Sequence, residues 1–298
     1  VGFSRISVNP SLSIIYKLNY AWRFTVHASY KERYGEMTDL YDRPYQTDYR
    51  NSVWNCGILP VYRQQLYSVY GEYKNTAREF FATVNLTHNR EWYNRIYEQR
   101  IENGQIQRVS LPLSNHGSGY TVKSTLSKGF YDLGLKTSLL ALLNISKAEQ
   151  ISGGQRLPYQ YRLMRLEPKV IWTPNRHWET SYQTDIRYGG SKIGERTRLA
   201  PLWNVTQQVQ LSYIFSPIEA SLSVDHYHND VNEDQSVNAV FADFSVLWKS
   251  RRLQITATAT NLFDKRTYGY TRYASLESYT SWVRIRPREF LVAIRYQL

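Results

Sequence analysis

The sequence predicts an all-β fold, a transmembrane antiparallel β-barrel, on three observations. Apolar and polar residues alternate with period two along most of the chain. The connections between these segments are alternately short and long, which is typical of a sheet with two unlike ends. Tyrosine and tryptophan are abundant, with 26 and 8 residues among 298, and both side chains suit a membrane–water boundary.

The alternation gives each predicted strand two chemically different faces. It is clearest in "WRFTVHASYK" (22–31), "IEASLSVDHY" (218–227) and "LQITATAT" (253–260). A helix would scatter the apolar residues of these segments around its circumference, whereas a strand places them all on one face. One face is therefore predicted to be apolar and the other to be polar.

Taken in order, the segments predict about thirteen strands. They lie near 5–18, 21–34, 61–74, 78–96, 118–128, 130–146, 159–173, 177–189, 202–215, 217–229, 236–249, 252–265 and 283–298. The short connections are 18–21, 74–78, 127–130, 173–176, 216–218 and 249–252. The long, polar connections are 35–60, 97–117, 147–158, 189–201, 230–236 and 266–282. Tight periplasmic turns and long external loops are the asymmetry of outer-membrane barrels.

A soluble sandwich or barrel is the alternative, because its strands also alternate. The predicted strands are long, however, often of about 13 residues, where about 5–6 is usual for soluble sheets. Aromatic residues also gather at the short-turn ends of the apolar faces, as a membrane girdle requires. These residues are Trp22, Phe80, Trp172, Trp178, Phe215, Trp248 and Tyr296. The low mean hydropathy of −0.53 fits a barrel as well, because half of each strand faces a wet lumen.

The net charge and the cysteine count limit the classes of partner and cofactor that the chain could have. The net charge is +12, but lysine and arginine are scattered without a basic run, so we expect a basic lumen and charged loops and no nucleic-acid partner. Cys56 is the single cysteine, so an internal disulfide is impossible. No cofactor is predicted. The first residues, "VGFSRISVNP", lack the features of a signal peptide, so either a leader has been removed or the chain is a piece of something longer.

The odd strand number raises a question of parity. If the last strand ends on the short-turn side, the first of thirteen strands begins at the external rim, whereas bacterial single-chain barrels have an even number of strands. We expect strands missing upstream, although a count wrong by one, or a second chain that completes the wall, would also explain the number.

Three stretches resemble a known family. They are "TNLFDKRTYGY" (260–270), "SYTSWVRIRPREFLVAIRYQL" (278–298) and, more weakly, "NPSLSIIYKLNYAWRFTVHASYKERYG" (9–35). The first resembles the Asn-Leu-Phe-Asp-Lys-x-Tyr signature near the end of TonB-dependent outer-membrane receptors, and the second resembles their final strand. The tyrosine-rich strands look most like the Bacteroidetes members of this group.

The resemblance implies a 22-stranded barrel that encloses a plug domain and carries an N-terminal TonB box. Residues 1–298 would then be a single barrel segment, its last thirteen strands, without the plug and the early strands. The implied location is the outer membrane of a Gram-negative cell, crossed many times. The implied partners are outer-membrane lipid, the missing strands and plug on the same or a separate chain, TonB through the absent N-terminal part, and a surface lipoprotein or other outer-membrane subunits.

The family also gives a role to the C-terminal strand, whose alternating apolar residues are implied to be the signal for the barrel-assembly machinery. The residues in question are Phe290, Val292, Ile294, Tyr296 and Leu298. The family usually ends in Phe, so Leu298 departs from its pattern.

The predicted ligand contacts lie in the longest loop, 35–60. Tyr41, Tyr45, Tyr49 and Trp54 could stack on a sugar, peptide or chelate ring, with Arg43 and Arg50 for anionic groups. The alternative is that these aromatic rings pack the loop upon itself.

The predicted function is energised import of a ligand bound by external loops. The alternative is a structural or accessory barrel subunit of an outer-membrane assembly or secretion complex. We expect no enzyme, because no convergent acid–base cluster is found. His226, His228 and Asp230 could face a metal from one strand, but a solvated strand end explains them more simply, so no metal site is predicted. The inward charges Glu179, Asp185, Arg187, Glu219 and Asp225 would contact a plug or water.

Overall fold

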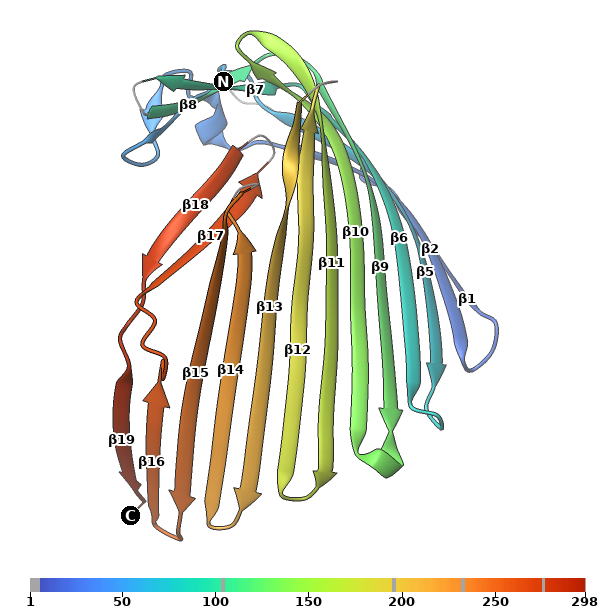
Figure 1. Ribbon diagram of the computed structural model, residues 1–298. Helices are drawn as coiled ribbons and strands as arrows, with labels where there is room; N and C mark the ends of the chain where they lie inside the picture. Colours follow the sequence, from blue (N-terminus) through green and yellow to red (C-terminus); the bar gives the residue numbers. More distant parts are fainter. Residues whose placement is uncertain (1–5, 103–104, 195–196, 232–233, 275–276, 298) are drawn as a thin grey trace.

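Thirteen long strands form one curved antiparallel wall in the computed structural model, which describes residues 6–102, 105–194, 197–231, 234–274 and 277–297 (Figure 1). They are β1 (Ser11–Lys17), β2 (Trp22–Tyr34), β5 (Val61–Asn75), β6 (Phe80–Tyr93), β9 (Asn115–Phe130), β10 (Leu135–Ser152), β11 (Gln155–Asn175), β12 (Trp178–Ile193), β13 (Thr197–Phe215), β14 (Ile218–Asp230), β15 (Ser236–Lys249), β16 (Leu253–Thr260) and β19 (Glu289–Tyr296). The predicted all-β class and the predicted thirteen wall strands are confirmed.

Each wall strand pairs with the next one along the chain. The ladder runs from β1–β2 through β2–β5, β5–β6, β6–β9 and onward to β16–β19. Within the described residues β1 pairs with β2 alone and β19 with β16 alone, so the wall has two open edges. The side chains of both edge strands are exposed along their whole length.

The strand register separates the wall into two faces. Trp178 lies opposite Tyr213, and Tyr188 lies opposite Trp203, with ring centroids 4.6 Å apart in both pairs. Because the two pairs are an even number of residues apart, they share one face. We call this aromatic and aliphatic face the outer face, and the opposite one the lumen face.

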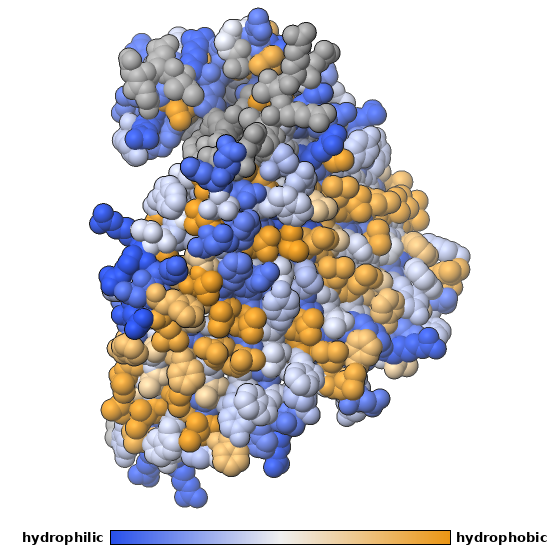
Figure 2. Space-filling model, viewed as in Figure 1, coloured by the Kyte–Doolittle hydropathy of each residue, from blue (hydrophilic) through white to orange (hydrophobic). Residues whose placement is uncertain are grey.

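The two aromatic pairs bracket a band of membrane dimensions. Ten residues separate Trp178 from Tyr188, which is about 33 Å along a strand and about 25 Å along the barrel axis at a tilt of about 40°. A height of about 25 Å is that of the apolar band of outer-membrane barrels. Figure 2 shows hydrophobic residues gathered over the strands and hydrophilic residues at the two ends of the wall.

The predicted aromatic girdle lies at the turn end of the outer face. Trp22 is opposite Tyr73, with ring centroids 4.8 Å apart, and Trp248 is opposite Ile218. Trp172 is opposite Leu135, and Tyr296 is opposite Leu253. These side chains therefore form a row along the short turns, as the sequence predicts.

Several connections carry structure of their own. The loop 35–60 contains the 3-10 helix η1 (Met37–Leu40) and the strands β3 (Tyr45–Gln46) and β4 (Asn51–Trp54). The next long connection contains β7 (Ile96–Glu102) and β8 (Gln105–Leu111), and the last contains β17 (Thr267–Ala274) and β18 (Glu277–Arg284). A short turn holds η2 (Tyr131–Leu133). Neither 3-10 helix, nor any other helix in the described ranges, has the length and apolar character needed to cross a membrane.

Two predicted boundaries are wrong for a local reason. The segment 147–158 is not a long loop, because β10 continues to Ser152 and β11 starts at Gln155. Gly153 and Gly154 have φ of 57° and 75°, a left-handed conformation that glycine adopts without strain. The two glycines therefore close a tight hairpin, and the strands run on beyond the predicted end of the wall. The predicted loop 189–201 is shortened in the same way, since β12 reaches Ile193 and β13 starts at Thr197.

The predicted last strand, 283–298, is interrupted. Between β18 and β19 the backbone binds the Asn-Leu-Phe-Asp turn: Asn261 Nδ2 donates to the carbonyl of Arg286 at 2.9 Å, and the amide of Arg288 donates to Asp264 Oδ1 at 3.0 Å. Pro287 has no N–H to offer a ladder. The two stretches that carry the family resemblance thus contact each other, and they fix where β19 begins.

Candidate functional site

Four short strands from two of the connections opposite the short turns form a small sheet at that end of the wall (Figure 1). β3 pairs with β4, β4 runs parallel to β8, and β8 pairs with β7. β7 joins the tip of β10 through a parallel bridge between Glu98 and Ile151. We call the sheet β3–β4–β8–β7 the cap.

The cap has a small core and a buried acidic anchor. Ile96, Val109 and Ile151 are all buried between the cap and the tip of β10. The buried carboxylate of Glu98 accepts hydrogen bonds from the amide of Gly154 at 3.1 Å and from Arg100 Nη2 at 2.7 Å. A buried carboxylate is tolerated only with such donors, so Glu98 fixes the cap to the β10–β11 hairpin.

A cavity of about 800 Å³ lies between the cap and the lumen face of the wall. Its cap side is formed by residues of the β3–β4 hairpin and of β7 and β8, and its wall side by residues of β6, β9, β10 and β11. The cap side includes Thr47, Asp48, Asn51, Ser52, Val53, Tyr97, Gln99, Ile106 and Arg108, and the wall side includes Asn89, Glu91, Tyr93, Asn115, Ser146, Gln150 and Tyr159. Its size is that of a small-molecule site.

The carboxylates of this cavity are occupied by protein donors. Glu91 accepts hydrogen bonds from the hydroxyls of Tyr62 and Tyr93, at 3.0 and 2.7 Å, and from two side-chain amides. Asp48 caps its own turn through the amides of Arg50 and Asn51, both at 2.8 Å. The acids therefore have little capacity left for a cation.

Two arginines flank one tyrosine on the cap side. The guanidinium carbon of Arg108 lies 3.8 Å from the ring centroid of Tyr97, and that of Arg95 lies 5.0 Å from it. Arg95 is bound by Asp39, with Nη1 donating to Oδ1 at 2.9 Å. Among the described residues no carboxylate forms an ion pair with Arg108, so its five donors remain available to an anionic group in the cavity.

The pKa values of Asp39 and Tyr97 are shifted by burial and by the neighbouring charges. Burial raises the pKa of Asp39, but the Arg95 guanidinium and the Glu36 amide outweigh it, and the net pKa lies below the usual value. Burial raises the pKa of Tyr97, against the opposing effect of the two arginines. At neutral pH the cavity therefore combines a neutral phenol, a paired arginine and the unpaired Arg108.

The six ligand residues predicted in the loop 35–60 lie beside the cavity rather than on its lining. Tyr41 meets Tyr45 edge to face, with centroids 6.0 Å apart, and Arg50 lies over the ring of Tyr49. Trp54 Nε1 donates to the carbonyl of Asp42 at 2.8 Å, and Arg43 is exposed. The lining takes other residues of the same loop, and a ligand role for these six stays a prediction.

The predicted insertion residues Phe290, Val292, Ile294 and Tyr296 share the outer face of β19. Val292 is opposite Ala257 and Ile294 is opposite Ile255, which continues the apolar band to the edge of the wall. All four side chains are exposed, and Leu298 lies outside the described residues. Their role as an assembly signal stays a prediction.

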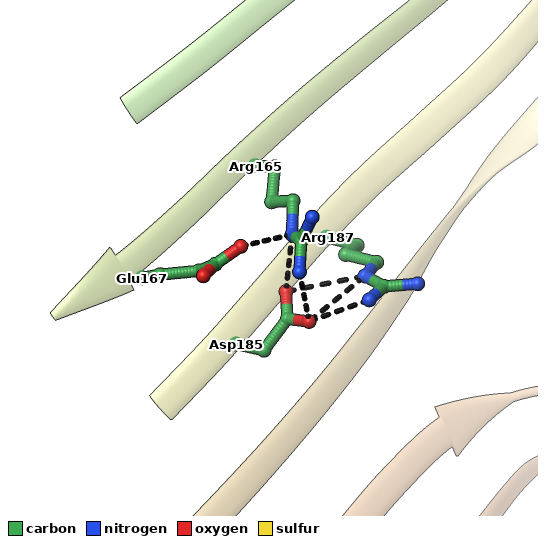
Figure 3. Close-up of polar contacts among 4 residues, drawn as sticks. All are labelled: Arg165, Glu167, Asp185 and Arg187. Carbon is green, nitrogen blue, oxygen red and sulfur yellow. Dashed lines mark hydrogen bonds and ion pairs between the residues drawn. The ribbon is translucent and has the colours of Figure 1, made fainter. Parts of the chain in front are cut away.

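The lumen face carries an ion network at mid-wall (Figure 3). Asp185 of β12 binds Arg165 Nη2 at 3.0 Å and Arg187 Nη2 at 2.6 Å, and Glu167 binds Arg165 from the other side. These four residues point away from the aromatic pairs, as the sequence predicts for Asp185 and Arg187. Two arginines and two acids give a neutral polar patch facing the lumen.

The histidines of β14 lie on the opposite face of the wall from the ion network. Val205 is opposite His228, so His228 and His226 lie on the outer face. His228 Nε2 is 3.3 Å from Asp230 Oδ1, and Nδ1 is 2.9 Å from Asn238 Oδ1. These contacts are ordinary strand-end hydrogen bonds.

The sequence interpretation missed Tyr97 and Arg108, because it treated 97–117 as an unstructured loop. A signal was present in the sequence, since Asn-Gly at 103–104 is a dipeptide typical of tight hairpins. What it could not give is the pairing of β8 with β4, because the two strands come from separate loops.

No family model matches the chain, and no curated protein matches it. Solved structures do match. FpvA of P. aeruginosa, bound to a heterologous pyoverdine and iron, aligns with 96% of this chain at 11% identity and a TM-score of 0.50. FyuA of Yersinia pestis, a ferric yersiniabactin uptake receptor, aligns with 97% of it at 8% identity and a TM-score of 0.46, and BauA of Acinetobacter baumannii, a ferric preacinetobactin receptor, with 85% at 8% and 0.48.

The chain spans 44% of the FpvA chain, 50% of FyuA and 44% of BauA. At such low identity the FpvA match establishes the fold alone, and it covers almost the whole of the chain described here. The protein is thus an antiparallel wall with the fold of part of a TonB-dependent receptor barrel.

Proposed function

We propose that this chain is part of the barrel of a TonB-dependent transport receptor in a bacterial outer membrane. In this role the cap captures a small ligand from outside the cell, and the ligand passes through the lumen into the periplasm. The proposed role is transport and not catalysis. The Bacteroidetes origin stays a prediction that rests on the tyrosine-rich strands of the sequence.

The cavity under the cap carries this proposal. Its volume of about 800 Å³ lies within the usual range for small-molecule sites, about 300–1,000 Å³. It lies between the cap and the lumen face of the wall, which is where an imported ligand would be held. Its acids are bound to protein donors while Arg108 is not, so the cavity favours a ligand with an anionic group.

The ion network at mid-wall supports the same function. Arg165, Glu167, Asp185 and Arg187 form exchangeable charged contacts on the lumen face. A plug domain held by such contacts can be displaced by force without exposing apolar surface. We therefore assign the network to contact with a plug.

The test is accumulation in whole cells that express the full-length protein. Cells would be given an extract of their growth medium, and mass spectrometry would identify the compounds that accumulate. We expect at least one compound whose uptake requires both this protein and a functional TonB complex, and whose uptake falls when Arg108 is replaced by Gln.

The alternative, an accessory barrel subunit of an assembly or secretion complex, has a distinct outcome. Deletion of the gene would then impair the complex, no compound would accumulate, and the Arg108→Gln change would be silent. That result would contradict the import proposal.

A further inference from the structure

One row of residues crosses five strands on the outer face. Arg90 of β6 is opposite Ser118 of β9, and Ser118 is opposite Lys147 of β10. Lys147 is opposite Gln160 of β11, which is opposite Lys192 of β12. We call these five residues the cation row. A cation occupies every second strand, so neighbouring cations are about 10 Å apart across the sheet.

The row lies immediately above an aromatic level. One step down, His88 of β6 stacks on Tyr120 of β9 with ring centroids 4.3 Å apart, and Tyr67 of the neighbouring strand β5 stacks on His88 at 6.4 Å. The next step down carries Leu86, Val122 and Leu143. Moving up β6, the outward side chains thus change from apolar Leu86 to aromatic His88 to cationic Arg90. At the middle level, β10, β11 and β12 carry Ile145, Arg162 and Gly190.

The height of the row matches the lipid head groups. Arg90 is ten residues along β6 from Phe80, which lies at the short-turn end, and this is about 33 Å of strand, or about 25 Å along the axis. The row therefore begins at the upper border of the apolar band at Arg90, where head groups meet the acyl region. It rises above that border towards β12, because Lys147 lies twelve residues from Leu135 and Lys192 fourteen from Trp178, at the short-turn end.

A groove of about 510 Å³ opens along the row. Arg90, Lys147 and Lys192 line it together with Trp92, His116 and Glu149. Glu149 is bound by Arg156 at 3.1 Å, and its charge is thereby compensated. Glu91 also borders the groove, but its side chain is directed to the lumen face, where Tyr62 and Tyr93 bind it. The groove is therefore net positive.

We propose that the cation row binds the phosphate group of an anionic lipid of the outer leaflet, with the acyl chains lying along the apolar steps below. The serine and glutamine between the cations add neutral hydrogen-bond partners for phosphate oxygens. A lipid, and not free phosphate, is favoured because the outer face below the row carries apolar side chains, among them Leu86, Val122 and Leu143. The inference depends on the membrane location in the proposed function and is independent of import.

The experiment uses the full-length protein in lipid nanodiscs, titrated with lipid A, which carries two phosphates, and with its dephosphorylated form. Native mass spectrometry would count the bound molecules. At about a fivefold gain in affinity for each cation near a charged membrane surface, the triple variant R90Q/K147Q/K192Q should bind lipid A about 100-fold more weakly. The variant R90K/K147R/K192R should bind it normally.

The matched control is K123Q/K136Q/K169Q, which removes three cations from the lumen face of β9, β10 and β11. It should leave lipid A binding unchanged, and heat-dependent gel mobility should show that every variant is folded. Equal loss in the two triple variants, no loss in the first, or displacement of lipid A by millimolar inorganic phosphate would each overturn the proposal. Normal lipid binding without any compound uptake would instead contradict the import function alone.

Discussion

The wall and the cap are both β-sheet, but different interactions hold them. In the wall, β10 and β11 pair without interruption from Leu135 opposite Trp172 to Ser152 opposite Gln155. In the cap, β3 has two residues and β4 has four, and single contacts such as Glu98 to Gly154 fix its place. The stability of a long ladder is shared among many residues, so no single one is decisive. The position of a short sheet depends on each of its few contacts.

The wall and the cap therefore depend on different features of the sequence. The wall needs only the period-two pattern and the correct length, so many residues on its lumen face are interchangeable. The cap needs particular side chains at particular positions. In the wall, the effect of a substitution should therefore depend on which face carries the residue. In the cap, it should depend on which residue is replaced.

The largest expected effect comes from placing a charge on the outer face. Val224 lies at mid-band, opposite Val209 and Ala242. Val224→Arg should lower the free energy of unfolding from a bilayer by about 2–4 kcal/mol, because a guanidinium at the midplane is poorly solvated. Ser223→Arg, one residue away on the lumen face, should change it by less than about 0.5 kcal/mol. Urea titration in liposomes measures both, and similar losses would mean that the faces are wrongly assigned.

The next effect tests a turn of the wall that depends on the identity of one residue. The buried Asn261 receives the Lys265 amide at 3.0 Å and donates to the carbonyls of Lys265 and Arg286 at 2.8 and 2.9 Å, with φ of 51°. Asn261→Ala should cost about 2–4 kcal/mol through unpaired backbone groups and left-handed strain. Asn204→Ala, at a lumen-facing position of β13, is the control and should cost much less. Denaturant midpoints in detergent would decide, and equal costs would deny the turn its special role.

In the cap, Arg108→Gln should weaken binding of the imported ligand about 10- to 150-fold, because one charge-assisted hydrogen bond is worth about 1.5–3 kcal/mol. Arg251→Gln is the control, since Arg251 is exposed in the turn between β15 and β16 at the other end of the wall and does not line the cavity. Isothermal titration with the compound found by accumulation would measure both variants. An unchanged affinity for Arg108→Gln would remove this residue from the site.

The smallest effect is a pH dependence of the loop that precedes the cap. The pKa of Asp39 is lowered in the folded protein, so its contact with Arg95 contributes stability above the unfolded pKa. That contribution should be lost as the pH falls through the lowered pKa, below the ordinary aspartate range. Hydrogen exchange of residues 36–41, corrected for intrinsic rates, should rise there while the wall stays protected. Asp39→Asn should abolish the pH step, and a step that survives would implicate another group.

The sequence predicts the wall well, because alternation is a local property that a single strand reveals. Strand number, face assignment and the girdle aromatics such as Trp178 and Trp248 all follow from it. The predicted strand boundaries are wrong where one or two residues determine the local backbone conformation. Gly153 and Gly154 turn a predicted loop into a hairpin, and Asn261 and Asp264 interrupt the predicted last strand.

The candidate site is less accessible from sequence. Arg108 meets Tyr97 within the β7–β8 hairpin, where Gln99 is opposite Arg108, but the cavity that both line also needs β8 to pair with β4 from another loop and β7 to join the tip of β10. Such pairings join residues far apart in the chain and leave no periodic trace. The predicted aromatics Tyr41, Tyr49 and Trp54 lie in the loop that contributes to the cavity without lining it, and their ligand role stays a prediction, since stacking potential is visible in composition and orientation is not.

The hairpin of β10 and β11 has one more consequence, for how the rim of this protein can vary among relatives. Its ladder is unbroken, and only two glycines lie beyond it. Deletion of a single residue from each strand would turn Lys147 inward and Ala148 outward, because facing alternates. Deletion of two from each strand would keep every residue on its side and lower the rim by about 5 Å. Evolutionary changes of height here should therefore come in even steps.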